Sequence, residues 1–306
     1  RSEMCIRDSK GTIVLQDFEH AEAIFVIGQN TGTNSPRMMS NLVEARKRGI
    51  PIVAVNPMPE RGLIRFAEPQ DVVQMATLGS TEISSEFVHI RIGGDLALIK
   101  GMMRVMFERE AQGERVLDHD FLAEHTVGLD ALRDDVMAQD WDDLVRVSGI
   151  SEAQIRRCAE IYIRSNATVI CYGMGLTQHQ YGSRLLQQVA NLLMLRGNFG
   201  KPGAGIGPIR GHSNVQGDRT VGIDEKPKPA YLDRVQQVFG FDPPREHGHH
   251  VVESIEAMLD GSAKVFIGLG GNFIHAVPDT PRAYEAMRGL ELTVGIATKP
   301  VSYTHL

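Results

Sequence analysis

Short apolar runs alternate with stretches of helical periodicity along most of the chain. The run Ala23–Gly28 is β-rich and ends in glycine, and Ile50–Val55 is a second run of the same kind. Between them, Ser35 and Pro36 form a typical helix start, and apolar positions recur at helical spacing through Arg48. A strand, a helix and a strand joined by short connections predict a βαβ unit with two parallel strands.

The same alternation continues beyond this unit. We expect a third strand at Phe87–Ile92, followed by Gly93, Gly94 and Asp95 at the start of another helix. Further elements are expected as helices at Ile155–Arg164, Tyr181–Arg196, Val252–Leu259 and Pro281–Arg288, and as strands at Ala167–Tyr172, Lys264–Gly268 and Leu290–Ile296. Helices that alternate with short strands are typical of α/β domains with a mostly parallel sheet.

Two segments interrupt the pattern. Gly197–Gly222 is rich in glycine and lacks clear periodicity, and loops of this length inside a compact domain are usually functional or disordered. Polar side chains such as Asn198 and Arg210 stand among these glycines, which argues against a mere linker. Asp224–His250 is rich in proline and charge, and we expect it to be an exposed excursion.

These elements predict an α/β fold of two Rossmann-like lobes, each doubly wound around a mostly parallel sheet. The first lobe is expected at residues 10–210, and a second, partial lobe at residues 211–300. Residues 1–9 and 301–306 fit no periodic pattern, and we interpret them as non-native tails. The fold is therefore expected to be incomplete at both ends, with any targeting segment outside the chain.

Composition and charge argue against several classes of function. The chain has 306 residues, of which 42% are apolar and 23% charged, as is ordinary for a globular protein. Lys and Arg total 32 against 38 Asp and Glu, so no basic stripe for nucleic acid is expected. No run approaches the roughly 18 apolar residues that a membrane helix requires. Cys158 and Cys171 are expected to be buried thiols, and low cysteine use is compatible with a cytoplasmic location.

Two loops resemble each other in position and composition. Gly28–Pro36 follows the first predicted strand, and Gly268–Pro278 follows the first strand of the second lobe. Each combines glycines with an asparagine and leads toward a helix started by proline. Glycine lets backbone N–H groups approach phosphate oxygens, and a helix N-terminus favours the anion. Ligands of open α/β sheets collect at the carboxyl ends of strands, so we expect both loops to contact a nucleotide and to open on a shared cleft.

Longer stretches of the chain resemble a known family. They are Lys10–Met38 (KGTIVLQDFEHAEAIFVIGQNTGTNSPRM), Gly173–His179 (GMGLTQH) and Leu195–Gln216 (LRGNFGKPGAGIGPIRGHSNVQ). These sequence segments are similar to those of the formate-dehydrogenase-like, or FdhF-like, alpha-subunit branch of the molybdopterin oxidoreductases. Thr31 and Ser35 differ from the residues that are usual at these positions in that branch. The resemblance covers nearly all of residues 10–300, as an internal fragment of a longer protein.

The resemblance implies a bis(molybdopterin guanine dinucleotide) cofactor with molybdenum, bound by both lobes. Asp95 matches a carboxylate that pairs with guanine N1 and N2, two adjacent donors that a carboxylate suits. Asn56 stands where many relatives carry an aspartate near the nucleoside. The expected cofactor-binding residues are Gly28, Gln29, Asn30, Thr31, Pro36, Asn56, Asp95, Gly175, His179, Gly271 and Asn272.

The resemblance also implies two catalytic residues. Arg210 and His212 match an element that lies beside the metal in the family, where the arginine orients an anionic substrate or stabilises developing charge. An imidazole at His212 could exchange a proton near neutral pH. Relatives carry the molybdenum-ligating residue and the motif for a 4Fe-4S cluster upstream of the matching region. We therefore expect no metal ligand in this chain and no turnover by the fragment alone.

The leading hypothesis is an oxidoreductase that takes electrons from a small anionic substrate, with formate as the expectation from the family, and passes them to an electron-transfer subunit. The alternative is a degenerate, cofactor-free scaffold or electron-transfer subunit of a respiratory-type complex. Arg210 favours the enzyme, because a scaffold has no physical need for a charged arginine among glycines. A nicotinamide dehydrogenase is disfavoured, since neither loop fits G-x-G-x-x-G and Asn56 is neutral. The histidines His247, His249 and His250 are more simply a solvated loop than a metal site.

Overall fold

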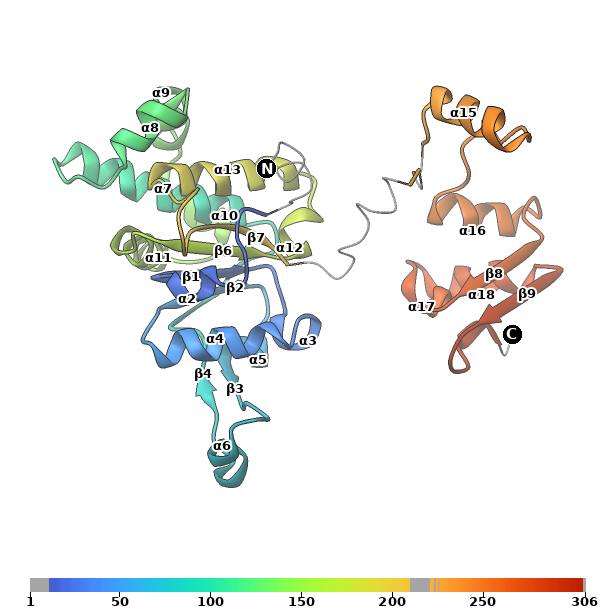
Figure 1. Cartoon of the computed structure of the whole chain (residues 1–306), viewed down its shortest axis with the longest axis horizontal. Helices are drawn as coiled ribbons and strands as arrows, with labels where there is room; N and C mark the ends of the chain where they lie inside the picture. The colour runs from blue at the N-terminus through green and yellow to red at the C-terminus, as the bar shows by residue number, and fades with distance from the viewer. Residues whose placement is uncertain (1–10, 210–220, 223, 225, 305–306) are drawn as a thin grey trace. The chain divides into compact units, whose positions relative to one another are not determined.

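The computed structural model describes residues 11–209, 221–222, 224 and 226–304 (Figure 1). The chain divides into two compact units, Arg1–Ser213 and Asn214–Leu306. Each unit contains its own parallel strands and its own apolar core. The two units are described separately below.

The first unit is built on a parallel sheet. In the described part of the chain this sheet has five strands in the order β5-β2-β1-β6-β7, and every neighbouring pair is parallel. The strands are β1 (Ala23–Ile27), β2 (Ile52–Asn56), β5 (Glu86–His89), β6 (Thr168–Tyr172) and β7 (Gly205–Pro208). The predicted α/β class and the parallel βαβ unit are confirmed.

Helices cover both faces of this sheet (Figure 1). Because side chains alternate along a strand, Phe25 and Ile27 of β1 belong to one apolar core, and Ile24 and Val26 belong to the other. One face packs against α7 (Asp95–Ala111), α11 (Glu152–Arg164) and α13 (Gly182–Leu195), and the other against α2 (Asp17–His20), α4 (Met38–Lys47) and α5 (Arg61–Ile64). The unit is therefore doubly wound, as its sequence pattern predicts.

Shorter elements complete the first unit. The remaining helices are α3 (Thr31–Asn34), α6 (Val72–Thr77), α8 (His119–His125), α9 (Leu129–Met137), α10 (Trp141–Ser148) and α12 (Met174–Thr177). Two antiparallel strands of two residues each, β3 (Arg65–Phe66) and β4 (Thr81–Glu82), flank α6 in an arm that projects from the sheet (Figure 1). Periodicity did not predict this arm, because strands of two residues carry no period.

Strand β7 corrects a second expectation. It lies within Gly197–Gly222, the segment expected to be irregular, yet it pairs in parallel register with β6. Glycine is required at this edge of the sheet because an ideal Cβ on Gly205 would lie 2.4 Å from Thr12 Oγ1. The backbone of Thr12 donates a hydrogen bond to Ile206 O at 2.9 Å. A four-residue strand with one apolar side chain among glycines and a proline has no apolar periodicity, which explains why the pattern missed it.

The second unit is smaller and also combines helices with parallel strands. Its strands β8 (Val265–Leu269) and β9 (Leu292–Ile296) are parallel. Its helices are α15 (Pro229–Phe239), α16 (Val251–Leu259), α17 (Phe273–Ala276) and α18 (Thr280–Arg288). Helix α15 falls in the excursion expected at Asp224–His250, and none of its residues is buried. The excursion is thus exposed, as expected, but partly helical.

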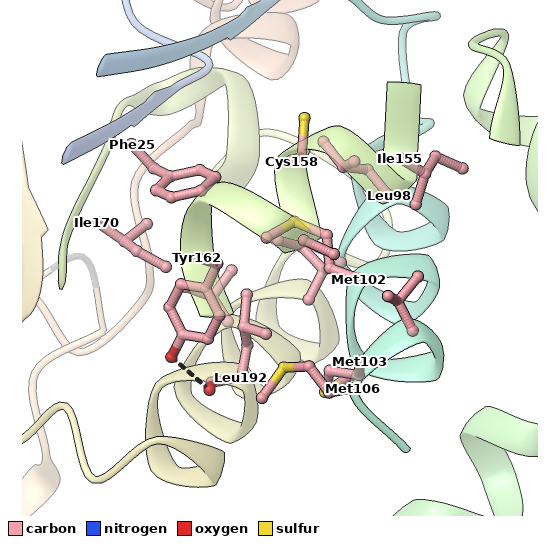
Figure 2. Packing of buried hydrophobic residues seen from close by; sticks show 14 of the residues in the cluster. Phe25, Leu98, Met102, Met103, Met106, Ile155, Cys158, Tyr162, Ile170 and Leu192 are labelled. Carbon is pink, nitrogen blue, oxygen red and sulfur yellow. Dashed lines mark hydrogen bonds between the residues drawn. The ribbon is translucent and has the colours of Figure 1, made fainter. Parts of the chain in front are cut away.

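The larger core of the first unit lies between the sheet and helices α7, α11 and α13 (Figure 2). Met102, Met103 and Met106 line one side of α7 and are buried there, which confirms that they pack in the core. Tyr162 from α11 belongs to the same core and is fully enclosed, and its ring packs at 78° to the ring of Phe25. Burial raises the pKa of its hydroxyl, which therefore stays protonated and must find hydrogen-bond partners.

The two cysteines within the described residues are structural. Cys158 and Cys171 are both buried and free. Burial raises the pKa of each thiol to about 12. Since the thiolate is the reactive species, neither residue is a nucleophile near neutral pH.

The hydroxyl of Tyr162 provides a test of this core. It donates a hydrogen bond to Leu192 O at 2.7 Å and accepts one from Asn198 Nδ2 at 3.0 Å. Tyr162→Phe leaves both partners unsatisfied, so the free energy of unfolding in urea should fall by about 1–3 kcal/mol. Tyr181→Phe is the matched control, because Tyr181 is 54% exposed and should tolerate the change. Equal stability of both variants would contradict this account of the core.

Candidate functional site

Because the strands are parallel, the loops that follow β1, β2, β5 and β6 all lie at the same end of the first sheet, where the strands have their carboxyl ends. The β1 loop contains Gly28, Gln29, Asn30 and Thr31, and Asn56 ends β2. Further residues of the predicted set, Asp95, Gly175 and His179, follow β5 and β6 in the same way. Pro36 is exposed in the turn between α3 and α4.

The loops that follow β1 and β6 contact each other through their backbone atoms. Gly175 N donates to Gly28 O at 3.1 Å, and Gly173 N donates to Ile27 O at 3.0 Å. An ideal Cβ on Gly175 would lie 2.7 Å from Gly28 Cα, and Gly28 has φ of +61°. No larger residue fits at either position without moving the backbone. The contact leaves a surface of bare main chain at the edge of the sheet.

Side-chain amides fix the start of the β1 loop. Asn56 Nδ2 donates to Gln29 O at 3.0 Å, and both residues are buried. Gln29 Nε2 in turn donates to Ser35 Oγ at 3.2 Å. The neutral amide of Asn56 therefore holds the loop, whereas an aspartate there would place an acceptor opposite the Gln29 carbonyl oxygen.

Asn30 organises the next turn. Its side chain accepts from Thr33 N at 3.2 Å and caps α3, while its Nδ2 donates to Glu60 Oε2 at 2.6 Å. Glu60 is a neighbour that sequence reasoning missed. Thr31 is fully buried, and its hydroxyl has no hydrogen-bond partner among the described residues. Because buried polar groups are normally paired, this unpaired hydroxyl costs stability where it lies within the β1 loop.

Asp95 and His179 approach each other from different loops. Asp95 is the first residue of α7 and is only 6% exposed. Desolvation raises the pKa of its carboxyl, partly offset by a hydrogen bond from its own backbone and by the field of His179. His179 is half-buried after α12. A buried carboxylate that lacks an ion-pair partner among the described residues is costly unless a ligand satisfies it.

The donor set fits a phosphate-linked guanine nucleotide. Bare glycine backbone and the N-terminus of a helix suit phosphate oxygens. A buried carboxylate suits the adjacent N1 and N2 donors of guanine, and side-chain amides can add neutral contacts. The residues present therefore match a molybdopterin guanine dinucleotide chemically.

The second unit has a related loop after β8. Leu269, Gly270, Gly271 and Asn272 line a pocket of about 740 Å³ together with residues 296–301. Gly270 and Gly271 have φ of +66° and +69°, a conformation that side chains disfavour. Asn272 begins the one-turn helix α17, as Asn30 begins α3, and its Nδ2 donates to Ser302 Oγ at 3.0 Å. In both predicted loops, a strand is thus followed by glycine, then by asparagine, and then by a one-turn helix.

The remaining candidates are the predicted catalytic residues and the histidine cluster. Arg210 and His212 lie outside the described residues. His250 caps α16 by accepting from Glu253 N, and His249 Nδ1 lies 3.2 Å from Glu253 O. No group of His, Cys, Asp and Glu within the described ranges could hold a metal ion. The histidine cluster therefore has a structural role at a helix start. Among the same residues, no helix has the length and hydropathy to cross a bilayer.

Comparison with known proteins finds relatives that match nearly the whole chain. Protein YdeP of Escherichia coli K12 is 47% identical over 302 residues, covering 97% of this chain and 40% of its own length. Formate dehydrogenase H of the same strain is 24% identical over 289 residues, covering 92% of this chain and 37% of its own. The chain thus spans about 40% of the length of these relatives.

A solved structure and a family model agree with this comparison. The acetylene hydratase of Pelobacter acetylenicus superposes with a TM-score of 0.57 at 16% identity, covering 91% of this chain and 39% of that one. At this identity the likeness shows the fold alone. The model of the molybdopterin oxidoreductase family matches residues 8–298, nearly the whole chain. The chain therefore belongs to the molybdopterin oxidoreductase family.

Proposed function

We propose that this chain is the cofactor-binding part of a molybdopterin-dependent oxidoreductase with a bis(molybdopterin guanine dinucleotide) cofactor. The observation that carries the proposal is the set of groups in the loops that follow the strands of the first sheet: a glycine-to-glycine backbone contact, a buried unpaired hydroxyl and a buried carboxylate. A protein that served only as a scaffold would gain nothing from a buried unpaired hydroxyl or a buried carboxylate, because the burial of each costs stability.

Each residue has a distinct part in this proposal. The backbone of Gly28 and Gly175, with Asn30 and Thr31, would hold phosphate and sugar oxygens, and Asp95 would pair with guanine. Gly271 and Asn272 would bind the second nucleotide. When bound, the cofactor would supply a molybdenum centre that accepts electrons from the substrate. Its metal ligand and the 4Fe-4S cluster are expected in sequence that precedes the matched region of the relatives.

Arg210 and His212 stay predicted catalytic residues. A planar guanidinium grips two oxygens of an anionic substrate at once, in a way that lysine does not reproduce. An imidazole exchanges protons near neutral pH. A formate-like anion is the substrate class that such a pair suits, and an electron-transfer subunit is the expected partner.

The most direct test of the proposal is chemical analysis of the full-length protein purified from a host that makes molybdopterin. Metal analysis should find molybdenum close to one atom per polypeptide. Acid release should give about two guanosine monophosphates for each molybdenum, as a bis-dinucleotide cofactor requires. Protein from a host that cannot make molybdopterin is the control. A folded full-length protein with neither component would refute the enzyme and favour the cofactor-free scaffold.

Asp95 gives a second test, with opposite effects on stability and binding. Because burial raises the pKa of Asp95 in the fold, its protonated form stabilises the chain below its unfolded pKa, and this contribution is lost as pH rises through the folded pKa. At pH 7 Asp95→Asn should therefore raise the free energy of unfolding of the cofactor-free protein by roughly 1 kcal/mol. The gain should vanish toward pH 4.

The same Asp95→Asn variant in the full-length protein should retain less guanosine monophosphate, because an amide offers guanine only one acceptor. Asp130→Asn serves as the control, since Asp130 is exposed on α9. Wild-type nucleotide content in Asp95→Asn, or a loss of stability at pH 7, would remove Asp95 from the guanine site.

A further inference from the structure

Glu60 is placed unusually for a residue at the start of a helix. It precedes α5, yet its carboxylate makes no capping bond to that helix. Oε2 instead accepts from Asn30 Nδ2 at 2.6 Å, across thirty residues of sequence. The side chain therefore turns away from its own helix and toward the β1 loop.

The backbone fixes Glu60 in this place. Helices α3 and α5 meet at Gly32 and Gly62, where an ideal Cβ on Gly62 would lie 2.8 Å from Gly32 Cα. Side chains at either glycine would push the two helices apart. With this contact and the bond to Asn30, the half-buried carboxylate of Glu60 is a rigid part of the β1 loop.

The carboxylate of Glu60 has unused capacity. Its Oε1 accepts no hydrogen bond from the described residues, and none of their cations lies within ion-pair distance. One hydrogen bond from a neutral amide leaves most of the acceptor sites of an ionised carboxylate open. A half-buried charge of this kind is best satisfied by neutral donors, since phosphate oxygens would repel it.

Asn56 explains why a carboxylate at Glu60 is useful. Nucleotide-binding α/β folds commonly place an acid at the end of the second strand, where it binds ribose hydroxyls. Here that position is Asn56, whose amide is committed to Gln29 O. Glu60 follows soon after on the same connection and carries a carboxylate.

We propose that Glu60 is a specificity-determining residue that accepts hydrogen bonds from the ribose hydroxyls of the nucleotide bound at the β1 loop. Oε1 faces the sugar, and Oε2 holds Asn30 in its capping position. The inference rests on the proposed function, because it needs a nucleotide at this loop. It adds the residue that distinguishes a ribose from a sugar that lacks its 2′-hydroxyl or carries a phosphate there.

The test compares two small ligands in place of the cofactor. Binding of GDP and of 2′-deoxy-GDP to cofactor-free full-length protein is measured by calorimetry. The wild type should bind GDP about tenfold more tightly, which corresponds to about 1.4 kcal/mol. In Glu60→Gln this preference should disappear, while the amide oxygen still accepts from Asn30 and the melting temperature stays close to that of the wild type. Glu82→Gln is the control for loss of one exposed negative charge and should keep the preference.

The outcomes separate this inference from the proposed function. Equal affinity of the wild type for the two ligands, no binding of either, or a preference that survives in Glu60→Gln would overturn the role of Glu60. None of these results would alter the molybdenum and guanosine monophosphate content, which decides the proposed function by itself. If Glu60 only positions Asn30, Glu60→Gln retains the preference and Glu60→Ala lowers the affinity for both nucleotides alike.

Discussion

The contact between Gly28 and Gly175 is the constraint on which the rest of the candidate site depends. Two parallel strands bring their carboxyl ends together, and only the absence of both side chains lets the loops exchange a backbone hydrogen bond there. That contact sets where α3 and α12 begin, and hence where Asn30 and His179 lie. A side chain at either glycine would cover the main chain that the site leaves bare.

The polar side chains around this contact are of two kinds: some stabilise the fold, and others do not. The amides of Asn56 and Gln29 and the hydroxyl of Tyr162 all have partners and stabilise loops or core. The Thr31 hydroxyl is buried without a partner among the described residues, and the burial cost of the Asp95 carboxylate is only partly offset by its own backbone and by His179. Buried polar groups whose cost the fold does not fully offset are expected in a binding site, where a ligand can satisfy them.

Much of this fold could be predicted from the sequence, because long strands and amphipathic helices carry clear periods. Strand β7 could not, since glycine and proline have no apolar pattern, and neither could the two-residue strands of the arm. For the site, the resemblance supplied the residues of the β1 and β6 loops, whereas Glu60 escaped notice. Its role depends on the packing of α3 against α5, which brings together residues thirty positions apart. No local pattern records such a contact.

The central claim is that the carboxyl edge of the first sheet holds the cofactor. Hydrogen–deuterium exchange of full-length protein with and without cofactor tests it most directly, because bound phosphate slows exchange of the amides that contact it. The account predicts slower exchange at residues 28–34 and 173–179 in the cofactor-loaded protein, with no change at residues 165–168 on the opposite edge. Loaded protein whose exchange at both loops equals that of cofactor-free protein would contradict the account.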